Sequence, residues 1–279
     1  MIDLPPARRR SIACGLALVG AIAVSGCGGG DDTTAAPASE ETALLPDEAD
    51  RSIAPIAPLS IERLPIGGGE DLDFVVVLPP GYTKGDRYPT AVALPPGDQA
   101  EGIAESTVQQ LFFRQARERG WIVISPIAPE GRLFFDGSHR RIPRLLKRLE
   151  SRFPPEGGKY HLVGLSNGGV SAFKLAIARP TLFQSLVVFP GFPRGLKDQT
   201  RLRRLQDVPV RMMVGQLDAG WVEPMRRTDI RLRRLGVDAT LQVEPGEGHF
   251  IGTVDGERLF ETLEPLRPEE PDQDPVVAS

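Results

Sequence analysis

Short, continuously apolar runs recur along the middle of the chain and predict the strands of a buried sheet. They cover residues 74–78, 90–94, 121–125, 160–164, 185–189, 210–215 and 240–244. Most of them show no alternation of apolar and polar residues, which is typical of strands covered on both faces in a parallel sheet.

Amphipathic helices are predicted between most of these runs. Within residues 138–150, apolar side chains recur at helical spacing and form one stripe, namely Ile142, Leu145, Leu146 and Leu149. Similar stripes follow Ser166 and precede Gly236. The first two runs are instead joined by the turn-rich segment PPGYTKGDRYP, which predicts an antiparallel edge hairpin. This order predicts an α/β fold with a mostly parallel, doubly wound sheet, whose ligands bind outside the carboxyl ends of the strands.

The two ends of the 279-residue chain differ in composition from its middle. Three arginines, an apolar run too short to span a membrane and small residues before Cys27 predict a signal peptide over residues 1–26. Residues 27–52 are predicted to be a tether and 53–267 one globular domain. The acidic, proline-containing residues 268–279 are predicted to be a disordered tail.

The segment Val24-Ser25-Gly26-Cys27 resembles the lipobox of bacterial lipoproteins. This resemblance implies that Cys27 is lipidated and that the protein is exported and anchored to a bacterial membrane in the cell envelope. The alternative is an ordinary signal peptide cut near Ala23. Cys14, the only other cysteine, would leave with the signal, so the mature chain would have no disulfide.

Charge and composition exclude several classes of partner. The net charge of −4 does not favour nucleic acid, and arginines near residues 201–204 and 226–234 alternate with leucines at helical spacing, which predicts solvated helix faces. Histidines and carboxylates show no metal-ligand spacing. We therefore expect neither a metal nor a cofactor.

The segment GLSNGG places one serine among glycines between a predicted strand and a predicted helix. It contains the pattern GxSxG as Gly164-Leu165-Ser166-Asn167-Gly168. A sharp strand-to-helix turn exposes a serine hydroxyl beside a backbone N–H and leaves little space for flanking side chains. The pattern favours Ser166 as a nucleophile over a glycine-rich turn or phosphate loop, since the GxGxxG and Walker lysine patterns are missing.

A serine nucleophile needs a histidine base that is held by a carboxylate. His249 lies in a glycine-flanked loop after the last predicted strand and is the predicted base. His161 begins the strand that leads to Ser166 and is expected to be structural. His139 opens the helix over 138–150, as a helix-start residue or as part of the rim of the site.

Asp218 is the predicted acid, because it follows the strand over 210–215 and so lies at a carboxyl end. The resulting chain order is Ser, Asp, His. Glu223 is the competing carboxylate, although its position suits the start of the following helix.

Residues 74–263 resemble the α/β-hydrolase superfamily, in particular its poly(3-hydroxybutyrate) depolymerase-like esterase branch. The segments VVVLPPGYTKGDRYPTAVALPPG, GLSNGG and RPTLFQSLVVFPG carry the resemblance. It implies an α/β-hydrolase fold with Ser166 as nucleophile, Asp218 as acid and His249 as base. No large cap domain is expected, because residues 190–207 leave room for only one helix.

The loop after the second strand departs from the family pattern. The family carries His-Gly there, whereas this chain has Pro95-Pro96-Gly97-Asp98. Because proline has no N–H, the expected oxyanion donors are the backbone N–H of Asn167 and that of Gly97 or Asp98. The Asp98 carboxylate would repel an oxyanion unless it points away.

We expect a serine esterase that cleaves a small or polymeric carboxylic ester through an acyl-enzyme. The side chains of Trp221, Phe250 and Phe192 are expected to line its pocket. The alternatives are a serine peptidase or acyltransferase with the same triad, or a catalytically weak or inactive lipoprotein of this fold that acts as a binding protein.

Overall fold

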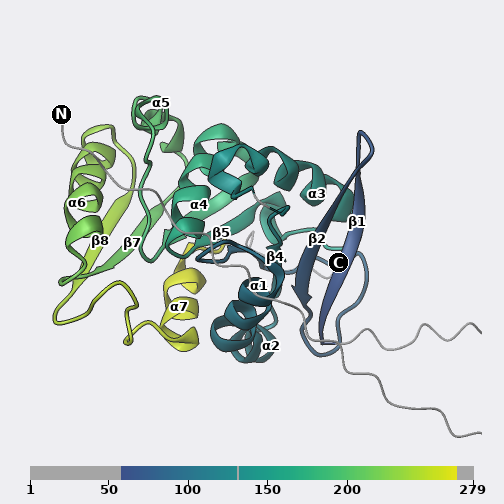
Figure 1. Ribbon diagram of the computed structural model, residues 1–279. Helices are drawn as coiled ribbons and strands as arrows, with labels where there is room; N and C mark the ends of the chain where they lie inside the picture. The colour runs from purple at the N-terminus through teal and green to yellow at the C-terminus, as the bar shows by residue number, and fades with distance from the viewer. Residues whose placement is uncertain (1–57, 131, 269–279) are drawn as a thin grey trace, which may run out of the picture. The chain divides into compact units, whose positions relative to one another are not determined.

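The computed structural model describes residues 58–130 and 132–268. The predicted signal peptide, Cys27, the tether and all but the first residue of the predicted tail lie outside the described residues. The fold is built on one eight-stranded sheet with the order β1-β2-β4-β3-β5-β6-β7-β8 (Figure 1). Its strands are β1 Leu59–Gly67, β2 Glu70–Val77, β3 Thr90–Leu94, β4 Ile122–Pro126, β5 Tyr160–Gly164, β6 Phe183–Val188, β7 Val210–Gly215 and β8 Ala239–Glu244.

The predicted mostly parallel sheet is confirmed. β4, β3, β5, β6, β7 and β8 run parallel to one another, and the antiparallel pairs are β1 with β2 and β2 with β4. Residues in β3, β4 and β5 are all buried, which explains why these strands read as unbroken apolar runs.

The antiparallel edge hairpin exists, but its predicted strands were wrong. β2 pairs with β1 and β4, and β3 is an inner strand between β4 and β5. The hairpin turn is formed by Gly67, Gly68 and Gly69, which have φ values of 87°, 67° and 72° that glycine adopts without strain. β1 alternates between exposed and partly buried residues because it is the edge strand, so its pattern gave no apolar run to recognise.

Helices cover both faces of the sheet (Figure 1). One face is covered by α1 Glu101–Thr107, the π-helical turn η1 Val108–Phe112, α2 Phe113–Arg119 and α7 Gly256–Leu263. The other face is covered by α3 Arg141–Leu149, α4 Asn167–Ala178 and α6 Ala219–Arg234. The short helix α5 is Leu196–Gln199, and 3-10 turns are η2 Phe134–Asp136, η3 Ser138–Arg140, η4 Glu156–Gly158, η5 Pro180–Leu182, η6 Leu202–Leu205 and η7 Glu264–Leu266.

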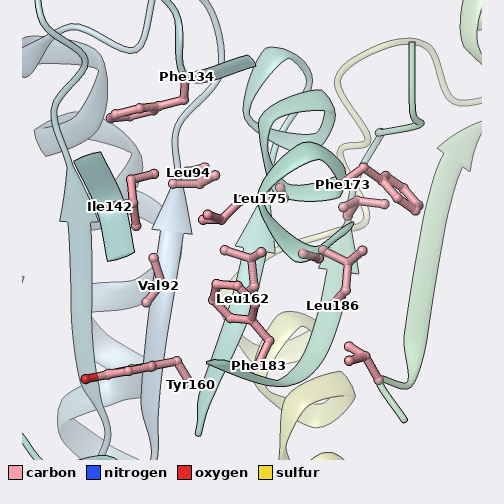
Figure 2. Packing of buried hydrophobic residues seen from close by; sticks show 14 of the residues in the cluster. Val92, Leu94, Phe134, Ile142, Tyr160, Leu162, Phe173, Leu175, Phe183 and Leu186 are labelled. Atoms are coloured by element: carbon pink, nitrogen blue, oxygen red, sulfur yellow. The ribbon is translucent and has the colours of Figure 1, made fainter. Parts of the chain in front are cut away.

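The core under α4 fixes the helix on the sheet. Phe173 and Leu175 of α4 are fully buried, and they pack with side chains that rise from β3, β5 and β6, among them Leu94, Leu162 and Leu186 (Figure 2). Such packing, at close to crystal density, holds a helix in one position. The first residue of α4 is thereby held at the carboxyl end of β5.

The connection from β6 to β7 is fully described and contains only α5 and η6. The structure thus has no large cap domain within that connection, as the sequence predicts. None of the helices in the described part of the chain combines the length and the apolar character that crossing a bilayer requires.

Candidate active site

Ser166 sits in a strained turn between β5 and α4. Its φ of 52° and ψ of −116° lie outside the regions that L-residues normally populate. The neighbouring glycines allow this turn to form: a Cβ on Gly164 would lie 2.5 Å from the carbonyl oxygen of Gly168, and one on Gly168 would lie 2.0 Å from that of Leu94. At Gly169 the added atom would lie 2.2 Å from the carbonyl oxygen of Pro190. The three glycines around Ser166 are therefore required by close backbone packing.

The structure brings together the three residues that the sequence predicts to act as nucleophile, base and acid. Ser166 Oγ lies 2.8 Å from His249 Nε2, and His249 Nδ1 lies 2.7 Å from Asp218 Oδ2. A carboxylate at Nδ1 favours the tautomer with its proton on that nitrogen, so Nε2 is left to accept a hydrogen bond from the serine hydroxyl. This arrangement can remove the hydroxyl proton as the oxygen attacks an electrophile.

The loop that carries His249 packs backbone against backbone on the end of β7. A Cβ on Gly215 would lie only 2.0 Å from the carbonyl oxygen of Gly248, so no other residue fits there without movement. The N–H of Leu217 donates to the carbonyl oxygen of Glu247 at 2.8 Å. Because Asp218 follows directly, these contacts set its position relative to His249.

Glu223 does not take the place of Asp218. Its side chain is 66% exposed and lies 3.7 Å from the guanidinium of Arg226, in the first half of α6. The carboxylate at His249 Nδ1 is that of Asp218, whose side chain is 11% exposed.

The predicted oxyanion donors lie at the start of α4 and in the loop that is hydrogen-bonded to it. Asn167 is the first residue of α4 and so presents its N–H at the helix N-terminus. Its side-chain Nδ2 donates to the carbonyl oxygen of Gly97 at 2.8 Å, which ties the proline-containing loop to the elbow. The Asp98 carboxylate accepts from the N–H of Ala100 at 3.0 Å, so this charge is engaged at the start of α1.

Gln99 fixes the same loop from the inside, and the sequence gave no sign of this. It is fully buried with a φ of 61°. Its Nε2 donates to the carbonyl oxygen of Pro95 and to Ser171 Oγ, each at 3.2 Å, and its Oε1 accepts from the N–H of Phe134 at 2.8 Å. Ser171 Oγ in turn donates to the carbonyl oxygen of Asn167 at 2.9 Å. A glutamine in a polar loop is normally exposed, so its pattern did not mark it for the core.

A cavity of about 330 Å³ opens beside Ser166 and His249. Its apolar wall comes from α1, η1 and the loops after β5, β6 and β8, and includes Ile103, Leu111, Leu165, Phe189, Ile251 and Val254. The sequence did not point to α1 or η1, because nothing in their pattern shows which end of the sheet they cover.

The three aromatic residues predicted for the pocket have different positions. Phe250 lines the cavity and is 83% exposed. Trp221 does not line it but lies against the base, with ring centroids of Trp221 and His249 5.0 Å apart. Phe192 packs on Trp221 at 5.2 Å and lines a separate cavity of about 210 Å³.

The other two histidines lie away from the serine. His161 is buried in β5, where its Nδ1 lies 2.8 Å from Ser185 Oγ and its ring packs on Trp121. Burial lowers the pKa of His161 to about 4, so the ring is neutral at pH 7. His139, in η3, is also buried, and burial together with nearby Lys174 lowers its pKa.

Residues 58–130 and 132–268 contain no cluster of three or more histidine, cysteine or carboxylate side chains that could hold a metal ion.

Sequence comparisons find no match, since neither a protein-family model nor a curated protein matches the chain. Solved structures do match. A thermostable esterase superposes with a TM-score of 0.60 at 15% identity, over 74% of this chain and 63% of its own length. The chain thus spans less than two thirds of that esterase.

Two further solved structures are matched over most of their own length. The feruloyl esterase module from Clostridium thermocellum, solved with sinapinate, has a TM-score of 0.61 at 14% identity over 75% of this chain and 87% of the module. An S-formylglutathione hydrolase from Agrobacterium tumefaciens has a TM-score of 0.56 at 16% identity over 75% of this chain and 94% of the enzyme. Together with the strand order and the strained serine turn, these similarities show that the chain has the α/β-hydrolase fold.

Proposed function

We propose that the protein is a serine hydrolase that cleaves a carboxylic ester through an acyl-enzyme. The observation that carries this proposal is the pair of hydrogen bonds that joins Ser166 to His249 and His249 to Asp218, at a turn that exposes the serine hydroxyl. The fold comparisons support it in a coarser way, because the matched structures include esterases and a thioester hydrolase by name.

In the proposed reaction, Ser166 Oγ attacks the carbonyl carbon of the ester while His249 Nε2 takes the hydroxyl proton. Asp218 stabilises the imidazolium that forms. The negative charge on the carbonyl oxygen is met by the N–H of Asn167 and by one from Gly97 or Asp98. The carbon–oxygen bond to the alcohol then breaks, and the alcohol leaves with the proton from His249. Water repeats these steps on the acyl-enzyme and regenerates the serine.

The cavity beside Ser166 indicates the class of substrate. With about 330 Å³ and a wall of aliphatic side chains and Phe189, it suits a short aliphatic or single-ring acyl group better than a charged one. We expect uncharged aryl esters to be better substrates than esters with a free carboxylate.

A fluorophosphonate probe tests the nucleophile, since it reacts covalently with an activated serine. We expect wild type to be labelled at Ser166 and Ser166→Ala to be unlabelled. Ser106→Ala is the matched control, because Ser106 lines the same cavity but its hydroxyl donates to the carbonyl oxygen of Ile103. A folded wild type that is not labelled and hydrolyses no aryl ester would favour the binding-protein alternative.

A further inference from the structure

A second cleft, of about 970 Å³, lies on the face of the sheet that α3 and α4 cover. It is bounded by α3, by the C-terminal half of α4 and by the segment with α5 and η6. Ser166, Asp218 and His249 do not line it. This cleft is therefore separate from the candidate active site.

The lining of this cleft is strongly basic. Nine of its residues are lysines or arginines, and Asp198 is its only carboxylate. The whole chain has a formal net charge of −4, so the cations are concentrated here against the overall balance. Arg201 and Arg204, which the sequence predicts to be solvated, are exposed, and both line the cleft together with residues of α3 and α4.

Only part of this charge is neutralised by the described part of the chain. Among the lining residues, Arg144 pairs with Glu70, Lys147 with Glu150 and Lys174 with Asp198. Six cations of the cleft form no ion pair with any described residue, namely Arg140, Arg148, Arg179, Lys197, Arg201 and Arg204. Surfaces normally mix the two signs, because unpaired like charges repel one another.

The C-terminal dipole of α4 explains only a small part of the cluster. A helix C-terminus carries about half a negative charge, which would attract one or two cations. Arg204 serves this purpose, because its guanidinium donates to the carbonyl oxygen of Ala178 at 3.3 Å. Lys147 and Arg148 in the last turn of α3 and Arg179 at the C-cap of α4 also lie at helix C-termini. Arg140 in η3 and Arg201 before η6 do not lie at the C-terminus of an α-helix.

One residue of the cleft lining carries an unsatisfied polar atom. His139 lines the cleft, is 8% exposed, and its Nδ1 has no hydrogen-bond partner among the described residues. A buried polar atom of this kind is destabilising unless a water or a ligand meets it.

We propose that this cleft binds a polyanion that carries several closely spaced phosphate groups. Arginine guanidinium groups, which make up most of the cations, bind phosphate oxygens in a bidentate manner, and lysines bind them as point charges. The volume lies at the upper end of that of small-molecule sites, which suits several phosphates in one ligand. Because the site is hollow, a soluble phosphate chain fits it better than the flat surface of an anionic membrane.

Binding of inorganic polyphosphate to the full chain tests the proposal, with the double variant Arg179→Gln and Arg201→Gln. We expect the affinity for polyphosphate to fall at least about 10-fold, and the slope of log affinity against log salt to fall by about two, one for each lost phosphate contact. The matched control is Arg203→Gln with Arg234→Gln, which removes two exposed cations outside the cleft and is expected to change neither value.

Vesicles that contain phosphatidylglycerol distinguish a lipid headgroup from a soluble phosphate chain. Binding of polyphosphate that the cleft variant loses and the control retains supports the proposal. It is overturned if wild type does not bind polyphosphate at low salt, if both double variants lose affinity equally, or if only vesicles bind. Turnover of a small aryl ester shows that the variants are folded, since neither arginine contacts the candidate active site.

Discussion

Gly215→Ala should separate the base from the acid without removing either of them. Gly215 ends β7, and the loop that carries His249 packs directly against it. The added methyl carbon would lie 2.0 Å from the carbonyl oxygen of Gly248 and 2.4 Å from that of Glu247. Carbon and oxygen atoms in close contact are normally about 3.3 Å apart. Both obstacles are backbone atoms, so no rotamer change can relieve the overlap.

The loop must therefore move by about 1 Å, which is enough to disrupt the hydrogen bond between His249 Nδ1 and Asp218 Oδ2. That bond is 2.7 Å long in the structure. A displacement of about 1 Å in a catalytic group costs on the order of 100-fold in rate. The overlap itself should lower the free energy of unfolding by about 1–3 kcal/mol, as overpacked sites do.

Two measurements check this, namely the rate of aryl-ester hydrolysis and thermal unfolding. Gly248→Ala is the matched control, because it adds a methyl group directly before His249 where no atom lies within 4 Å. We expect Gly215→Ala to be folded and about 100-fold slower, and Gly248→Ala to stay within a few-fold of wild type. The reasoning fails if Gly215→Ala retains the wild-type rate, or if both variants lose activity alike.

Two further variants test the interior. Gln99→Ala leaves the N–H of Phe134 and the carbonyl oxygen of Pro95 without their buried partner. The free energy of unfolding, measured with urea, should therefore fall by about 3 kcal/mol. The control Gln109→Ala removes an exposed side chain and should leave this free energy almost unchanged. His161 has its pKa lowered by burial to about 4, so the folded state resists protonation while the unfolded state takes up a proton near its ordinary pKa of about 6.5. The contribution of His161 to the free energy of unfolding is thus fully present above about pH 6.5 and is lost as the pH falls toward 4. Between about pH 7.5 and pH 5 the free energy of unfolding should fall by about 2 kcal/mol for this reason. His161→Asn should lack this part of the pH dependence, and an unchanged dependence would show that other groups cause it.

The parallel strands and the turn that carries Ser166 were predictable because their sequence signals are local. An apolar run marks a buried strand, and a glycine-flanked serine marks the turn at its end. The topology of the sheet determines which loops meet. In a parallel sheet the carboxyl ends of the strands lie at one edge, so Asp218 after β7 and His249 after β8 were expected close to Ser166. The distances among them follow this expectation.

Features that depend on which segments pack together were not predictable. β1 alternates weakly because it is an edge strand, so the antiparallel pair was assigned to residues 90–94 instead. Gln99 looks like a loop residue, and only the structure shows that Ser171 and Phe134 surround its side chain. The basic cleft is another case, because Arg148 and Arg201 are far apart in sequence and belong to helical segments that each look ordinary.

The helix α4 connects the two sites and also limits how they can influence one another. Its N-terminus carries Ser166 and Asn167, while the cleft is lined by α4 from Lys174 onward, so about 12 Å of helix separates them. For a ligand in the cleft to change the geometry at the serine, α4 would have to slide along the sheet. Gly168 and Gly169 prevent this, because their backbone is in direct contact with the loops after β3 and β6. Phe173, fully buried farther along the helix, adds a packed anchor. A polyanion bound in the cleft is therefore expected to leave the proposed chemistry at the serine unchanged.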